Sequence, residues 1–183
     1  MRHIFFCLIA WMGFLPSWGH ARLDDTERRC VERYGSAERP KQRVIMPEPL
    51  VSGATESTYH FQGWALRVAF LDGKVVAQEY QKELPHPSGK TIKAEELQAI
   101  LEAEQSGGAW ERSATHPLKA DKPEMIIGTA LLGGMHWKRS DGAGATLTPM
   151  AYTIVFYSRE GIQAALRAEA AKEQKRRKSM PKF

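Results

Sequence analysis

The chain has 183 residues, of which 43% are hydrophobic and 26% are charged, and its formal net charge is +5. This length fits a single ordinary domain that buries a real core. Two cysteines exclude a fold stapled by several disulfides, and basic residues gathered at one terminus without interleaved aromatic residues argue against a nucleic-acid-binding protein.

The N-terminal segment has the pattern of a signal peptide. Arg2 precedes an apolar run over residues 4–15, Pro16 breaks that run, and small residues lead to Ala21. A run of this length is too short for a bilayer, which needs about 20 helical residues. We therefore expect residues 1–21 to be cleaved together with Cys7, and the mature chain to be exported to the periplasm or the extracellular space without a transmembrane segment.

The first expected element of the mature chain is a short helix over residues 25–34. Asp24 is placed to act as its N-cap, and Glu27 completes a capping-box pattern. Gly35 stands where a left-handed C-terminal cap is wanted. The apolar residues between them recur on one face, so the helix should lie on a sheet.

That sheet is expected to begin with a hairpin. Apolar residues alternate over residues 64–70, and a second apolar run over residues 75–80 is expected to pair with them. Asp72-Gly73 supplies the positive φ angles of a two-residue turn between the two strands. Residues 57–62 form a plausible third strand, while the proline-rich, polar residues 36–56 are expected to be a connection.

The second half of the chain repeats this pattern. An amphipathic helix is expected over residues 93–105, Trp110 begins a further strand, and residues 113–123 have the composition of a loop. A second hairpin should pair residues 135–139 with 147–157. Because the latter segment is apolar on both faces, its strand is expected to be central.

A last helix should begin near Gly161, dock through Ile162, Ala165 and Leu166, and end in water. Together the elements predict an α+β domain over residues 22–171, in which an antiparallel sheet of two hairpins, about 4–6 strands, is covered by two or three helices. The residues expected to form the core are Cys30, Val31, Tyr34, Val68, Phe70, Ile154 and Phe156.

No motif in the chain is specific enough to name a reaction. Cys30 is open to three interpretations, which are a core residue, an intermolecular disulfide and a nucleophile activated by a histidine. His60, His86, His116 and His136 lack the spacing of paired metal ligands, so no cofactor or metal is expected.

Three tryptophans leave a second choice open. Trp64, Trp110 and Trp137 either pack in the core or form an aromatic platform for a sugar or a peptide.

The C-terminal segment, residues 172–183, is the feature with the strongest functional interpretation. Its basic residues are Lys172, Lys175, Arg176, Arg177, Lys178 and Lys182. They either solvate the end of a helix or bind anionic lipid headgroups or other polyanions, each charge contributing about 1 kcal/mol near such a surface.

Three motifs support a resemblance to known proteins. They are Thr26-Glu27-x-x-Cys30-x-x-Arg33-Tyr34-Gly35, Val68-Ala69-Phe70-Leu71-Asp72-Gly73-Lys74 and Trp137-Lys138-Arg139-Ser140-Asp141-Gly142. With them the chain resembles small exported bacterial proteins of no assigned activity. A helix that ends in glycine before a hairpin is also similar to SmpA-like envelope modules and to the beta-lactamase-inhibitor-protein fold. The SmpA-like proteins are lipoproteins, whereas this chain lacks a lipid-attachment cysteine, and the resemblance implies no catalytic residue.

The resulting hypothesis is an exported, non-catalytic binding module of the cell envelope. Its partners would be envelope proteins or an anionic lipid or polyanion surface, reached through residues 172–183. The alternative is a secreted, hydrolase-like enzyme with a dispersed active site. In that enzyme His60, His116 or His136 would converge with an acidic residue or with Cys30 in a cleft.

Overall fold

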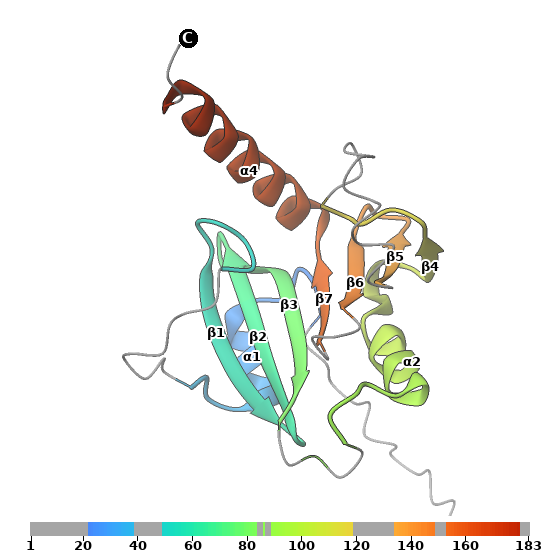
Figure 1. Ribbon diagram of the computed structural model, residues 1–183. Coiled ribbons are helices and arrows are strands. Elements are labelled where there is room, and N and C mark those ends of the chain that lie inside the picture. Colours follow the sequence, from blue (N-terminus) through green and yellow to red (C-terminus); the bar gives the residue numbers. More distant parts are fainter. Residues whose placement is uncertain are drawn as a thin grey trace, which may run out of the picture.

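The structure is a computed structural model, and it describes residues 22–38, 49–83, 86, 89–118, 134–148 and 153–179. These residues form three α-helices, one 3-10 helix and a seven-stranded antiparallel sheet (Figure 1). The elements are α1 (Glu27–Tyr34), β1 (Thr55–Phe61), β2 (Trp64–Leu71), β3 (Lys74–Lys82), α2 (Ala94–Ala103), η1 (Gln105–Gly107), β4 (Trp110–Ser113), β5 (Met135–Arg139), β6 (Gly144–Thr148), β7 (Thr153–Tyr157) and α4 (Arg159–Ser179). The predicted α+β class with an antiparallel sheet is thereby confirmed, whereas the signal peptide predicted over residues 1–21 lies outside the described residues.

The strands form two meanders that meet in the middle of the sheet. The strand order is β1-β2-β3-β7-β6-β5-β4, so the first meander follows α1 and the second follows α2. The predicted turn between β2 and β3 is confirmed, since Asp72 and Gly73 both have positive φ angles, of 50° and 73°. β7 is the fourth strand of seven, which confirms the central position expected from its two apolar faces.

The predicted number of strands was too small because one predicted strand is two. The segment 147–157 contains the end of β6 and all of β7, which pair with each other. Pro149 lies between them in the sequence, and proline has no N–H to donate to a strand ladder. The partner of β5 in the second hairpin is therefore β6 alone.

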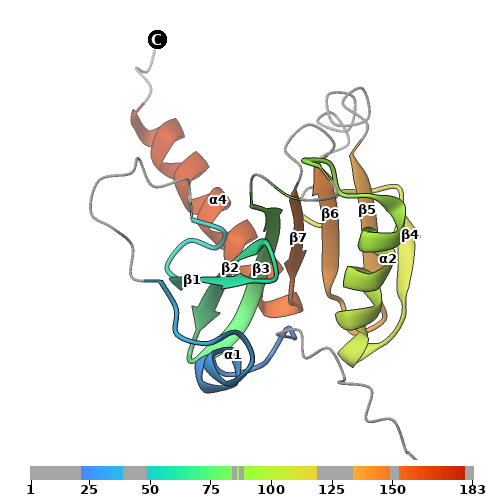
Figure 2. The ribbon, with the colours of Figure 1, turned by 90° about the horizontal axis from the view of Figure 1, so that it is seen from below.

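Helices cover both faces of the sheet. Figure 2 shows α1 and α2 on one face and α4 on the other. Under α1 and α2 lies the larger apolar cluster, which includes Cys30, Val68 and Phe156. Under α4 lies the smaller one, which includes Val76 and Val155. Burial of apolar area on both faces, at about 25 cal/mol per Å², is the main stabilisation of this fold.

Two details of α1 and α4 differ from expectation. The N-cap of α1 is Thr26 rather than Asp24, and its side chain accepts a hydrogen bond from the Arg29 amide over 3.4 Å. Val31 is 41% exposed and Leu166 is 39% exposed, so neither docks as predicted. Each lies on the solvent side of a helix that reaches the sheet through neighbouring positions.

The start of α4 is fixed rigidly on β3. Ser158 donates its amide to the Val76 carbonyl over 2.9 Å, and its side chain accepts from the Gly161 amide over 3.1 Å. A Cβ at Gly161 would lie 2.2 Å from the Val76 carbonyl oxygen, so only glycine permits this approach. This contact sets the direction in which the rest of α4 leaves the sheet.

Candidate functional site

The first candidate site is the C-terminal half of α4. The helix has 21 residues and spans about 31 Å, and only its first turns contact the sheet, mainly β3 and β7. The remainder projects from the body of the molecule (Figure 1). The predicted boundary between residues 171 and 172 lies within this continuous helix. The projecting half of α4 is polar all round, and it remains helical because the first turns of the same helix are anchored on the sheet.

The charges of this half divide into a paired and an unpaired set. Arg176 and Arg177 both bind the Glu173 carboxylate, over 2.7 and 2.9 Å, and these contacts lower the pKa of Glu173 to about 2. Within the described residues Lys172, Lys175 and Lys178 form no ion pair, and all three are exposed. We call Lys172, Lys175 and Lys178 the lysine set. Lys182, the last residue of the predicted anionic-surface site, lies outside the described residues.

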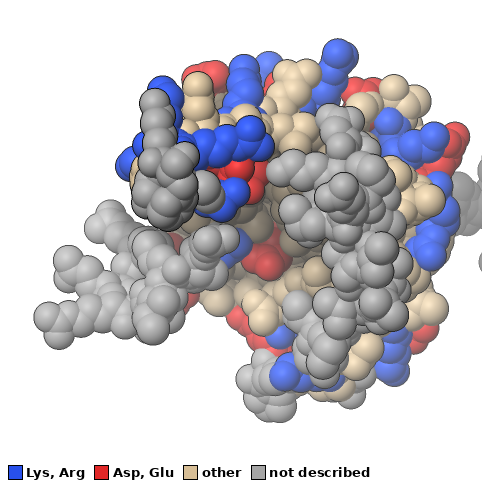
Figure 3. Space-filling view, turned by 45° about the horizontal axis from the view of Figure 1, so that its top comes forward, with Lys and Arg blue, Asp and Glu red and all other residues tan. Residues whose placement is uncertain are grey.

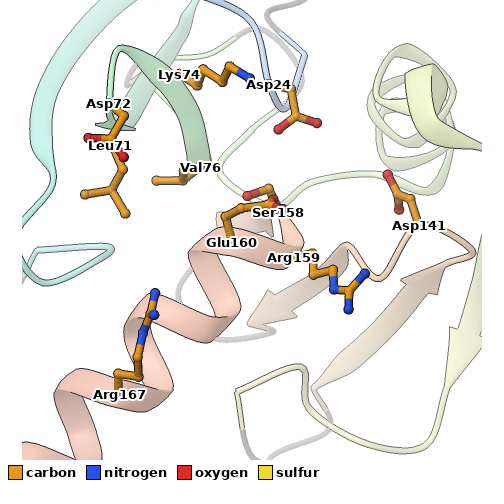
Figure 4. Close-up of a pocket in the computed structure, with 10 residues that line it drawn as sticks. All are labelled: Asp24, Leu71, Asp72, Lys74, Val76, Asp141, Ser158, Arg159, Glu160 and Arg167. Carbon is orange, nitrogen blue, oxygen red and sulfur yellow. The ribbon is translucent and has the colours of Figure 1, made fainter.

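A second candidate site lies at the base of α4, and we call it the base pocket. It is an open cavity of about 630 Å³ between the α4 start and the turns at the ends of β2 and β5 (Figure 4). Its acidic lining residues are Asp24, Asp72, Asp141 and Glu160. In the space-filling view, a hollow near the middle of the molecule contains acidic side chains and is bordered by Lys and Arg side chains (Figure 3).

Three basic residues, Lys74, Arg159 and Arg167, share the base pocket with these carboxylates. Asp24 reaches it from an unusual backbone conformation, with φ of +74°, while its amide donates to the Val75 carbonyl over 2.9 Å. Burial raises the pKa of Asp24, and the nearby Glu160 carboxylate adds to that rise.

Asp141 differs from the other carboxylates in this pocket because it is already paired. The Arg139 guanidinium holds it over 2.7 to 3.0 Å, and this contact lowers the pKa of Asp141.

A buried polar cluster links the two halves of the sheet. Glu104, at the end of α2, is fully buried and accepts hydrogen bonds from the Tyr80 hydroxyl over 2.7 Å and from Gln78 Nε2 over 3.3 Å. Arg139 and the Trp110 indole donate to its backbone carbonyl. Burial raises the pKa of Glu104 to about 7, and the hydrogen bond from Tyr80 and the charge of Arg139 offset only part of that rise.

The described histidines do not all converge on one site. His60, on edge strand β1, lies between the Glu38 and Glu83 carboxylates, which raise its pKa. His116 and His136 contact each other, with ring centroids 5.0 Å apart. His86 packs edge-on against Trp64. Across the part of the chain that the structure describes, no group of three or more His, Cys, Asp or Glu side chains is arranged to hold a metal ion.

Cys30 is a core residue of α1. It has no exposed surface, and burial raises the pKa of its thiol to about 12. The charged groups that act on it are Asp25, Arg33, Glu27 and Glu104. Among the described residues, no histidine acts on Cys30 as a base would on a nucleophile, and a buried thiol is also out of reach of an intermolecular disulfide.

The tryptophans pack rather than form one platform. Trp110 lies 5.3 Å from the Phe156 ring, centroid to centroid, and the Arg139 guanidinium carbon lies 4.9 Å from the Trp110 ring centroid. Trp137 is 6% exposed. Trp64 lines a small cavity of about 160 Å³ between β2 and α2.

The sequence prediction missed the base pocket, although a signal for it was present. Both Asp-Gly pairs, at residues 72–73 and 141–142, are turn signals. In an antiparallel sheet these turns connect neighbouring strands at one end, where the pocket forms. What the sequence does not reveal is that β3 and β7 pair, and this pairing brings the two meanders together.

Comparison with known proteins does not identify a family for this chain. No family model matches the chain, and no curated protein matches it. Among solved structures, a cysteine-rich secretory protein of Staphylococcus aureus is similar with a TM-score of 0.40 and 12% sequence identity, over 75% of this chain and 45% of that chain. The chain thus spans less than half the length of that protein, and a likeness at this level assigns no function.

Within the described ranges, no helix combines the length and the apolar character that crossing a membrane requires.

Proposed function

We propose that this protein is an exported, non-catalytic binding module of the cell envelope that attaches to an anionic surface through the C-terminal half of α4. The observation that carries the proposal is the lysine set on a projecting helix, whose charges are not neutralised by the protein's own described carboxylates. The proposal includes cleavage of residues 1–21 and the distant kinship with SmpA-like envelope modules.

The physical basis is electrostatic attraction at an exposed site. Each Lys or Arg near an anionic lipid surface contributes about 1 kcal/mol. The lysine set should therefore contribute about 3 kcal/mol, which corresponds to roughly a hundredfold in affinity. Arg176 and Arg177 contribute less, because Glu173 already binds them.

Attachment through α4 leaves the body of the domain available to another ligand or partner. The helix holds its basic end away from the sheet, while the base pocket opens at its anchored end. A surface-bound domain of this kind would act as a tethered receptor.

The test is co-sedimentation of the mature chain, residues 22–183, with vesicles of phosphatidylcholine alone or with 30% phosphatidylglycerol. We expect binding only to the anionic vesicles. Replacing the lysine set by glutamine should weaken that binding by roughly a hundredfold.

A matched control replaces three basic residues elsewhere, Arg28, Lys93 and Lys138, by glutamine. All three are exposed. Each substitution removes one positive charge, so the net charge changes as much as in the lysine-set variant, but the charges are removed from other elements. The control should bind as the unaltered protein does. Equal loss in both triple variants would mean that net charge, rather than α4, determines binding, and the proposal would be wrong.

A further inference from the structure

A small pocket beside α2 has mostly apolar walls, and we call it the α2 pocket. Its volume is about 160 Å³. On the side of the sheet it is lined by Phe61 and Trp64, which are partners in the register of β1 and β2. On the side of α2 it is lined by Ala99 and Ile100. Phe61 and Trp64 are both partly exposed, so the pocket opens at the surface.

A third aromatic residue lines the α2 pocket two positions farther along the strands. Tyr80 of β3 pairs with Leu66 of β2, and both line the pocket. The Tyr80 hydroxyl donates to the buried Glu104 carboxylate over 2.7 Å, so Tyr80 offers the pocket its ring rather than its hydroxyl. The rings of Phe61, Trp64 and Tyr80 therefore supply most of the sheet side of the pocket.

The one charged residue among the described lining residues is Glu96, and its charge is already compensated. Lys82, whose side chain has no exposed surface, donates to the Glu96 carboxylate over 2.6 Å. The same ammonium group donates to the Thr91 carbonyl over 2.7 Å. A charged ligand would lose its hydration in this pocket without gaining a counter-charge, and such a loss is costly. The lining therefore favours an uncharged ligand.

The walls of the α2 pocket are held by α1 and α2, which cover the same face of the sheet (Figure 2). Lys82, on β3, is joined to the first turn of α2 through Glu96, which also accepts from the Lys93 amide over 2.7 Å. On the other side, the Tyr34 ring of α1 packs edge-on against Phe61, with the ring centroids 5.6 Å apart. A pocket held in this way loses little freedom when a ligand binds.

We propose that the α2 pocket binds one uncharged aromatic ring, carried by a small molecule of about the size of benzyl alcohol. A dry apolar cavity of about 150 Å³ accommodates benzene, so the volume of this pocket suits a single ring. Aromatic rings attract one another beyond the area that they bury, which favours an aromatic ligand over an aliphatic one. The assignment does not use the lysine set, so it stands or falls separately from surface attachment.

The probe is benzyl alcohol, titrated into the isotope-labelled protein and followed by NMR. Three compounds of similar size test its chemistry, which are the cation of benzylamine, the benzoate anion and cyclohexylmethanol. We expect benzyl alcohol to bind and to shift the indole N–H signal of Trp64, which the Trp64→Phe variant identifies. The two charged compounds should bind at least about tenfold more weakly, and cyclohexylmethanol about threefold to tenfold more weakly. Failure of benzyl alcohol to bind, or equal binding of any comparison compound, would overturn the assignment.

A substitution on α2 tests the location. Ala99 is exposed and leucine is a good helix former, so the Ala99→Leu variant should fold. Its added carbon atoms should fill the pocket and weaken the binding of benzyl alcohol at least about tenfold.

The matched control is Ala94→Leu, the same substitution at an exposed position of α2 outside the described lining. It should bind benzyl alcohol as the unaltered protein does. If Ala99→Leu binds as tightly as this control, the ring is bound elsewhere and the assignment is wrong.

Discussion

Replacement of Glu104 by glutamine should remove a large part of the pH dependence of stability. The carboxyl group is fully buried, and burial raises its pKa from 4.5 to about 7. Each pH unit between the unfolded and folded pKa values is worth about 1.4 kcal/mol, so the total is about 3 kcal/mol.

The sign follows from which form the fold prefers. Because the folded pKa of Glu104 is the higher one, the folded state favours the protonated carboxyl group. Its contribution is fully present below pH 4.5 and is lost as the pH rises through about 7. Glutamine resembles the protonated form, so the Glu104→Gln variant should not lose this contribution.

The assay is urea unfolding followed by tryptophan fluorescence, with the free energy of unfolding compared at pH 4.5 and about pH 8. We expect the difference between the unaltered protein and Glu104→Gln to change by about 3 kcal/mol across this range. Glu102→Gln, the same chemical change at an exposed position two residues earlier, should show no such change. A difference between Glu104→Gln and the unaltered protein that is the same at both pH values would refute the reasoning.

Three further predictions follow from single contacts. The pKa of His60, followed by NMR of its ring, should lie above 6.5 because the Glu38 and Glu83 carboxylates stabilise the protonated ring. The stabilising effect of this contact should be present below pH 6.5 and vanish as the pH rises through the folded pKa. A pKa at or below 6.5 would contradict the contact between His60 and the two carboxylates. Gly161→Ala should lower the free energy of unfolding by about 1–3 kcal/mol in urea melts, because the new methyl group meets the Val76 carbonyl, and an unchanged midpoint would show that α4 is not seated there. Cys30 should react with iodoacetamide only in denaturant, and rapid alkylation of the folded protein would mean that the thiol is accessible.

Local sequence signals were sufficient for much of the sheet. The Asp72-Gly73 turn with alternating apolar residues on either side determined the hairpin β2–β3, since both turn residues need positive φ angles. The double apolar character of residues 153–157 placed β7 at the centre. These features depend on residues close together in the chain, so the local pattern of turn and apolar residues is enough to predict them.

Features that depend on long-range pairing could not be predicted. The base pocket needs β3 beside β7, and nothing local specifies which strands meet. The burial of Glu104 could not be predicted either, because a glutamate at the end of an amphipathic helix is ordinarily solvated. Its burial depends on Gln78 and Tyr80, which are on a strand more than twenty residues earlier.

The most direct test of the proposed envelope module is the salt dependence of its attachment to phosphatidylglycerol-containing vesicles. Screening shortens the reach of a charge from about 10 Å at 0.1 M salt to about 3 Å at 1 M. We predict that attachment of the mature chain is strong at low salt, falls steeply as salt is added, and has a much shallower slope after the lysine set is replaced. An identical slope in both proteins, or attachment that is indifferent to salt, would contradict a role for α4 as the surface anchor.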